Sequence, residues 1–425
     1  MMGATSIGGC RHWEIEFDRD GALIADGGLV ADVESGAVTD LVVFCHGWNT
    51  SVASARGLGH AMFELIAERM DPARRASTGL VTLLWPSLLF PEDEPAWEGR
   101  VMVAPAPPAR APVECSGHEL ALALAPAFPD QKYELTRIGT LLDTRPPDPG
   151  GFAEFHRLAS GLVTSPNTAA EDDGESTART TRTRTALEGM ATLAALGAEP
   201  VPGRDLWEGG RDLLRVLSYY EMKNRAGVVG RVGLGPLLTG LRTHRPELRA
   251  HLVGHSFGGR LVSFALAGLP EVPASPVGSL VLVQAAFSHY AFAPTLPHDP
   301  SRSGALAGVA DRVNGPLLAT YSVFDRAVGW WYPNASILAR QDNQVIAEFT
   351  TRWGGLGFDG FQQDGVVDRE LLPVGGGYEW RPRTLYRLDA NKVINRDLGW
   401  LAGAHSDIRK PELAWAVVTA AGLAP

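Results

Sequence analysis

The sequence predicts an α/β protein with a doubly wound, mostly parallel sheet, interrupted by one large insertion. Continuous apolar runs, such as residues 41–45 and 279–283, are typical of strands that a parallel sheet buries on both faces. Helical patterns alternate with these runs, as layered α/β folds require. We expect the core to comprise residues 1–90 and 203–425, and residues 91–202 to form a cap-like, partly low-complexity insertion.

Composition narrows the class of protein. The chain has 425 residues, of which 45% are hydrophobic and 20% charged, as in an ordinary globular enzyme. Its net charge of −10 disfavours nucleic acid or an anionic membrane as a partner. The three cysteines (Cys10, Cys45 and Cys115) have no metal-binding spacing, so we expect no metal and no cofactor. No secretion leader and no membrane-spanning apolar run is recognisable, which predicts a cytoplasmic protein without an integral membrane segment. The oligomeric state stays open.

The first part of the core begins with a hairpin. Residues 13–17 alternate between apolar and polar, and a turn sequence follows at residues 18–21. A buried strand is then predicted at residues 40–45, and Thr50 or Ser51 can cap the helix after it. Residues 80–85 form a second buried strand, so the three elements make a βαβ unit with a right-handed crossover.

The insertion has a different character. It contains two proline-rich segments and a run of Ser, Thr, Ala and charged residues at 164–185 that cannot bury enough apolar surface to pack. We expect that run to be an exposed, protease-sensitive tip. Short helices are predicted at the apolar patches, which are residues 120–124, 135–142 and 187–196.

The second part of the core returns to regular alternation. Helical patterning covers residues 206–217 and 237–241, and the last helix has Pro411 in its first turn. Buried strands are predicted at residues 249–253, 279–283, 316–324 and 384–388.

The stretch Gly-His-Ser-Phe-Gly at residues 254–258 organises the rest of the chain. An apolar strand precedes it and an apolar helix follows at once, so Ser256 stands at the apex of a sharp turn. Gly254 and Gly258 leave the room that such a turn needs, because larger side chains would collide as strand and helix close up. This arrangement predicts that Ser256 is a nucleophile at a nucleophile elbow.

A serine nucleophile needs a base and an acid, which in a strand–elbow–helix layout follow it in the order acid, then histidine. His405 lies between the last strand and the last helix, whereas His289 and His298 come too early and are expected in loops beside the site. Asp325 follows a buried strand at the sheet edge where such sites form, and is our candidate acid. Other carboxylates fall in the permitted interval: Asp311, Asp342, Asp359, Asp364, Asp368 and Asp389.

The oxyanion hole requires two backbone N–H groups. One is expected from Phe257, directly after the nucleophile. The other is expected from Trp48, in the loop after the first buried strand, where Gly47 permits a close backbone approach. The side chain of His46 is expected to be structural.

Together these motifs resemble the α/β-hydrolase superfamily of serine esterases and lipases, and within it a bacterial group with a His-Gly-Trp/Tyr-Asn oxyanion loop. The resemblance rests on residues 46–49, 84–87, 254–259, 321–326 and 404–406. It extends over residues 13–70, 80–87 and from 206 onward, and does not cover the insertion. It implies that Ser256 is the nucleophile, Asp325 the acid, His405 the base, and Trp48 with Phe257 the oxyanion hole.

The expected function is that of a serine esterase, a lipase-like hydrolase that acts on a small-molecule carboxylic ester through an acyl-enzyme. Fold alone does not fix the substrate, so thioesters, lactones, acylglycerols and amides stay open, including a peptidase on the same catalytic triad. A catalytically silent binding or interaction module on the same scaffold is a further alternative. Labelling by a fluorophosphonate, which requires an activated serine, separates the enzyme from the silent module.

Overall fold

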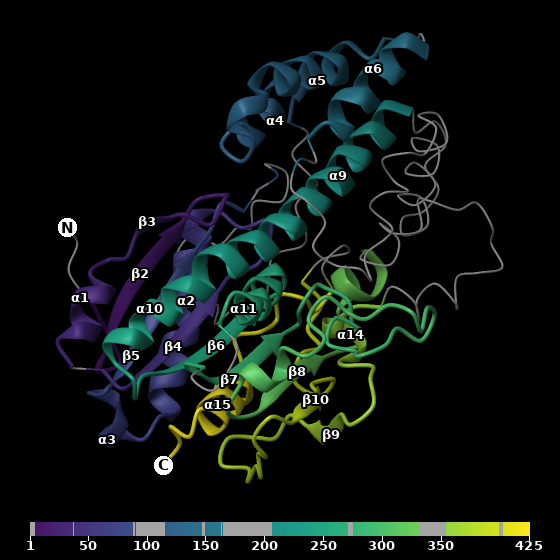
Figure 1. Cartoon of the computed structure of the whole chain (residues 1–425). Coiled ribbons are helices and arrows are strands. Elements are labelled where there is room, and N and C mark those ends of the chain that lie inside the picture. The colour runs from purple at the N-terminus through teal and green to yellow at the C-terminus, as the bar shows by residue number, and fades with distance from the viewer. Residues whose placement is uncertain are drawn as a thin grey trace.

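The central feature of the computed structural model is a mixed, mostly parallel sheet covered by helices, which places the chain in the α/β class (Figure 1). The structure describes residues 5–36, 38–87, 90, 115–146, 149–162, 164, 206–270, 275–331, 354–398 and 403–425. The strands are β1 (Thr5–Ile7), β2 (Cys10–Phe17), β3 (Leu23–Ala25), β4 (Asp40–Cys45), β5 (Thr78–Leu84), β6 (Arg249–His255), β7 (Val277–Val283), β8 (Leu317–Tyr321), β9 (Val367–Glu370) and β10 (Leu385–Asp389).

The strand order is β1-β2-β5-β4-β6-β7-β8-β10-β9, with β3 paired to β2. The opening hairpin is confirmed, since β2 and β3 pair antiparallel, as do β1 and β2; the remaining neighbours are parallel. From the adjacent pair β4 and β6 the chain winds outward in both directions, to β5 on one side and to β7 on the other. The crevice beyond the carboxyl ends of such a pair is where open α/β sheets bind ligands.

The register brings the two motifs predicted from the sequence together. Cys45, the last residue of β4, lies opposite Gly254 of β6. The loop that begins at His46 and the elbow at Ser256 therefore leave the sheet side by side, at the same edge. Both strands are fully buried apart from Arg249, as expected for the centre of a parallel sheet.

The sheet has a hydrophobic cluster on each face. Along β4, Val42 and Phe44 belong to one cluster, whereas Leu41 and Val43 belong to the other, because successive side chains point to opposite faces. The first cluster includes side chains of α2 and α15, and the second those of α10 and α11. The helices around the sheet are α1 (Leu29–Glu34), α2 (Val52–Arg69), α3 (Pro72–Arg75), α10 (Gly235–His244), α11 (Phe257–Ala267), α14 (Leu356–Asp359) and α15 (Pro411–Ala420).

The helices of the insertion lie together, away from the sheet, at one end of a long helix, α9 (Leu206–Val228) (Figure 1). The predicted helix at residues 120–124 is α4 (Gly117–Leu124), and the one at 135–142 is α5 (Lys132–Thr144). A further helix, α6 (Pro149–Ser160), was not predicted from the sequence. Helices α5 and α6 pack on α9, whose other end packs on α11. The predictions for residues 187–196 and for the tip at 165–185 lie outside the described residues.

One strand is shorter than predicted. The apolar run at residues 316–324 suggested a strand as far as Phe324, but β8 ends at Tyr321. Ser322 Oγ donates instead to Ile394 O (2.6 Å), and the Val323 N–H donates to Asn391 Oδ1 (2.9 Å). These bonds turn the chain out of the sheet, so Asp325 stands in a turn beyond the strand end.

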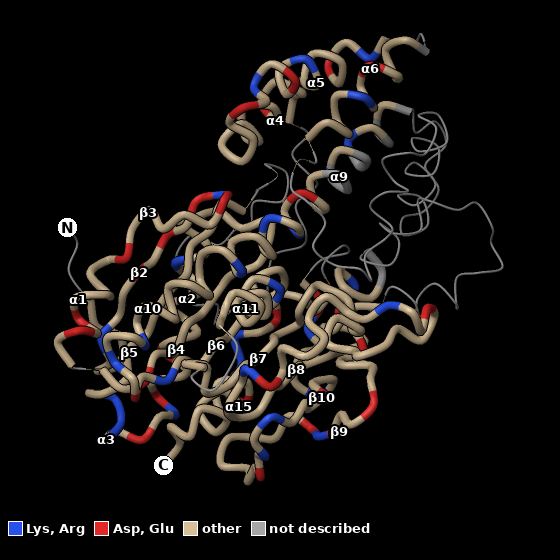
Figure 2. The backbone as a smooth tube through the Cα atoms, in the orientation of Figure 1, with Lys and Arg blue, Asp and Glu red and all other residues tan. Residues whose placement is uncertain are grey.

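Charged residues of both signs are interspersed along the backbone (Figure 2). The net charge of −10 is therefore spread over the molecule. None of the helices within the described ranges is both long enough and apolar enough to cross a membrane.

Candidate active site

Ser256 occupies a strained position between β6 and α11. Its backbone angles are φ 55° and ψ −123°, a conformation that a residue with a side chain adopts only under constraint. A Cβ added at Gly254 would lie 2.4 Å from Gly258 O, and one added at Gly258 would lie 2.2 Å from Cys45 O. Both glycines therefore have the close contacts that the sequence predicted for them. The side chain of Ser256 is 7% exposed.

The loop after β4 approaches this serine closely. A Cβ at Gly47 would lie 2.6 Å from Ser256 Cβ and 3.1 Å from Ser256 Oγ. The next amide, Trp48 N–H, and the first amide of α11, Phe257 N–H, have no acceptor in the described part of the chain. One of these donors thus directly follows the serine, at the positive end of a helix, and the other directly follows Gly47, which approaches the serine closely.

His46 fixes the orientation of this loop. It is buried, and burial lowers the pKa of its imidazole to about 4, so the ring is neutral. Its Nδ1–H donates to Gly47 O (2.9 Å), its ring stacks on that of Trp85, and Trp85 Nε1–H donates to His46 O (3.1 Å). Because the carbonyl and the following N–H of a trans peptide point in opposite directions, these bonds turn the Trp48 N–H away from His46. The expectation of a structural role for His46 agrees with these contacts.

His405 and Asp325 meet although 80 residues separate them in the chain. His405 Nδ1–H donates to Asp325 Oδ2 (2.8 Å), and the carboxylate is fully buried. Asp325 Oδ1 accepts from Val328 N–H (3.0 Å) at the start of a short π-helix, η5 (Ala327–Trp331). The carboxylate therefore caps that turn with one oxygen and orients the imidazole with the other.

Backbone contacts hold the two loops against each other and against the elbow. Gly403 forms an antiparallel bridge with Asp325, and Ala404 N–H donates to Phe324 O (2.8 Å). His255 is buried, which lowers its pKa to about 3, and its Nε2–H donates to His405 O (3.0 Å).

The rings of His255 and His405 lie 4.9 Å apart. Among the described contacts, no hydrogen bond joins Ser256 Oγ directly to His405. The structure thus brings His405 to Asp325 and to the residue before Ser256.

Three of the other residues considered from the sequence, Asp389, Asp359 and His289, have partners outside the site. Asp389 Oδ1 accepts from the backbone and side-chain amides of Asn391. His289 pairs with Asp359, with 2.8 Å between Nδ1 and Oδ2. Asp342 lies outside the described residues.

Two further residues of the site, Gln284 and His255, were not predicted from the sequence. Gln284 Nε2–H donates to Asp325 Oδ2 (2.9 Å). It directly follows β7, so the strand-end argument that selected Asp325 could also have selected Gln284.

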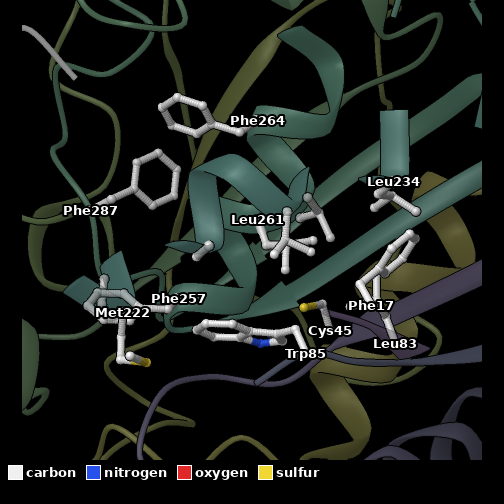
Figure 3. Close-up of a cluster of buried hydrophobic side chains, with 14 of the residues drawn as sticks. Phe17, Cys45, Leu83, Trp85, Met222, Leu234, Phe257, Leu261, Phe264 and Phe287 are labelled. Atoms are coloured by element: carbon white, nitrogen blue, oxygen red, sulfur yellow. The ribbon is translucent and has the colours of Figure 1, made fainter. Parts of the chain in front are cut away.

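Aromatic rings surround Trp48. Its ring contacts those of Phe90, Tyr219 and Phe257, at centroid distances of 6.3, 5.6 and 6.1 Å. Phe257 belongs to a buried cluster with Trp85 and Met222 (Figure 3), which anchors the start of α11. Phe90 lies directly before the insertion and Tyr219 lies in α9, which follows it, so the core segments on both sides of the insertion contact the loop beside Ser256.

A second chain of Ser, His and Asp lies at the opposite, amino end of the strands. Ser279 Oγ is 3.0 Å from His251 Nδ1, and His251 Nε2 is 3.1 Å from Asp40 Oδ1. Arg249 and Arg74 also pair with Asp40. Burial alone would raise the pKa of the Asp40 carboxyl, but the hydrogen bonds from His251 and Arg249 hold that pKa well below its usual range. Ser279, His251 and Asp40 are buried, so we interpret this chain as a link between β4, β6 and β7.

A comparison with protein-family models, curated proteins and solved structures finds no significant match to this chain. Within the described ranges, no group of three or more His, Cys, Asp or Glu side chains could together hold a metal ion.

Proposed function

We propose that this chain is a serine hydrolase that cleaves carboxylic esters, on a fold of the α/β-hydrolase type. Ser256 is the nucleophile, His405 the general base and Asp325 the residue that orients the base. The observation that carries the proposal is the His405–Asp325 hydrogen bond of 2.8 Å, made by a buried carboxylate at the sheet edge from which the strained Ser256 projects.

The proposed reaction follows from these positions. His405 Nε2 takes the proton of Ser256 Oγ as the oxygen attacks the ester carbonyl carbon, and Asp325 stabilises the imidazolium that results. The Trp48 and Phe257 amides donate to the carbonyl oxygen as it gains negative charge. The protonated His405 then gives its proton to the departing alcohol. Water, activated by the same imidazole, attacks the acyl-enzyme, and the acid product leaves with Ser256 restored.

This proposal requires His405 Nε2 to reach Ser256 Oγ when substrate is bound. Catalytic hydrogen bonds are often long before substrate binds and tighten in the Michaelis complex. The bond from His255 to His405 O holds the backbone of the base beside the elbow, which favours that approach.

We further propose that the insertion covers the site as a cap. The chain leaves the core directly after β5, where Ser87 Oγ donates to Thr50 O (2.8 Å) and Phe90 N–H donates to Asn49 Oδ1 (2.8 Å). Both acceptors belong to the loop that follows β4. An insertion anchored to this loop is suited to shield the acyl group from water and to select its length.

The test is hydrolysis of p-nitrophenyl esters of graded chain length by the wild type and Ser256→Ala. The wild type should turn over these esters. Ser256→Ala should retain only the low residual rate that the oxyanion hole and substrate binding provide. Turnover that survives the substitution would refute the proposal. Binding of esters without turnover by a folded wild type would favour a silent binding module instead.

A further inference from the structure

Gln284 lies between the elbow and the acid–base pair. It follows β7 directly, its side chain is fully buried, and its φ of 45° is in the left-handed region that residues with a side chain rarely adopt. On one side of it Ser256 N–H donates to Val283 O (3.2 Å), and on the other Ala286 N–H donates to Ser256 O (3.2 Å). The backbone that carries Gln284 therefore also supports the nucleophile.

The hydrogen bonds of Gln284 determine which way its amide faces. Nε2 lies 2.9 Å from Asp325 Oδ2 and 2.8 Å from Gly357 O, and both of these atoms accept only. Oε1 lies 3.0 Å from Thr320 Oγ1, which accepts from the Gln284 backbone N–H (3.1 Å) and so has its hydrogen available for Oε1. Turning the amide over would set Oε1 against two acceptors. Both amide hydrogens are thus engaged, one of them on Asp325.

We infer that Gln284 is a positioning residue that acts through Asp325 on His405; this inference rests on the proposed function. Gln284 donates to Oδ2, the oxygen that also accepts from His405 Nδ1. Together with Val328 N–H on Oδ1, it fixes the rotation of the carboxylate, and the carboxylate in turn fixes the imidazole.

The amide is suited to this role because it is neutral. A cation at the same place would draw the negative charge of Asp325 away from the imidazolium that forms as Ser256 attacks. An apolar side chain would leave Oδ2 with a single donor and the carboxylate free to turn. An amide holds the carboxylate without neutralising it.

A purely structural role would be to pair buried polar groups, and it makes different predictions. Gln284→Met keeps an unbranched side chain of similar length and removes both donors. We expect kcat to fall about 10- to 100-fold with KM unchanged, the range seen when an outer hydrogen-bond partner of a functional histidine is lost. Val281→Ala, in β7 just before Gln284, is the control for lost stability alone and should leave the kcat of the folded protein at the wild-type value.

Two further measurements separate positioning from stability. The His405 Nδ1 proton should give a resonance downfield of the amide protons, displaced in Gln284→Met and unmoved in Val281→Ala. Gln284→Glu, which is isosteric, sets a second carboxyl group against the buried Asp325. Two carboxyls so close share one proton and lose it only at raised pH, so the pH profile of kcat/KM should gain a titration that the wild type lacks. Should Gln284→Met fail to fold, this pH profile carries the test.

The outcomes for the two proposals are distinguishable. The proposed function stands if the wild type hydrolyses esters and Ser256→Ala does not. The inference on Gln284 is nevertheless overturned if folded Gln284→Met keeps the wild-type kcat and Gln284→Glu keeps the wild-type pH profile. If wild type neither hydrolyses esters nor labels at Ser256, the proposed function is overturned, and the role of Gln284 in that reaction with it.

Discussion

Gly47→Ala tests whether the loop after β4 supplies the Trp48 amide to the oxyanion hole beside Ser256. The added Cβ would lie 2.6 Å from Ser256 Cβ, and ordinary contacts begin at 3.4 Å, so 3.4 − 2.6 = 0.8 Å of separation must be gained. Misplacement of reacting groups by about 1 Å costs roughly 10²-fold in rate, and loss of one oxyanion donor costs about 10²–10³-fold. We expect kcat for a p-nitrophenyl ester to fall about 100-fold, with the burst amplitude reporting the fraction of competent enzyme.

Gly57→Ala is the matched control. Gly57 is exposed within α2, and a Cβ there meets nothing within 4 Å. Activity should be unchanged, and the free energy of unfolding should rise by about 0.5–1 kcal/mol because alanine favours the helix. Wild-type kcat in Gly47→Ala, with the protein folded, would refute the assignment of the Trp48 amide to the oxyanion hole.

Further expected results concern the acid, pH and the insertion. Asp325→Asn should fold and lose up to about 10⁴-fold in kcat, because the imidazole loses the partner that sets its tautomer. Asp389→Asn should be active. The reverse pattern in the kinetics would show that Asp389, at the end of β10, is the acid. His46 and His255 have pKa values lowered by burial to about 4 and about 3 from 6.5, so the unfolded chain binds protons that the folded chain does not. The contribution of these two histidines to the free energy of unfolding should therefore be level above about pH 6.5 and fall below it by up to about 1.4 kcal/mol per pH unit for each histidine. His46→Gln should lower this slope in urea titrations at several pH values. Arg225 donates to Pro86 O, Ala127 O and Glu221. Arg225→Met should therefore cost about 3–5 kcal/mol and speed proteolysis of α4–α6, whereas Glu221→Gln/Arg225→Met should cost less. Equal losses would show that removing the cation beside the buried Glu221 carboxylate is not the cause.

Most of the core could be predicted because its signals are local. The buried strands read as continuous apolar runs, and the elbow combines a strand, small residues and a helix within residues 249–267. The paired positions of β4 and β6 then follow from the topology of a parallel sheet. The end of β8 was misjudged because Val323 and Phe324 are apolar yet exposed, and their backbone is held by side chains distant in sequence.

The connections within the site were less predictable. The contacts of Gln284 and His255 join loops that are distant in sequence. Gln284 lies 41 positions from Asp325, and His255 lies 150 positions from His405. Chain order could propose His405 and Asp325 as partners, but their distance of 2.8 Å depends on the bridge between Gly403 and Asp325. Helix α6 carries a moderate apolar pattern that the neighbouring proline-rich sequence obscured.

Mass-spectrometric mapping of a fluorophosphonate adduct tests the central claim most directly. The phosphonyl group should be found on Ser256 of the wild type, and labelling should be lost in Ser256→Ala and slowed in Asp325→Asn, since only an activated serine reacts. Ser279→Ala, which removes the hydroxyl of the buried Ser–His–Asp chain at the opposite sheet edge, should label as the wild type does. A folded wild type without any adduct, or an adduct on Ser279 in place of Ser256, would contradict the account.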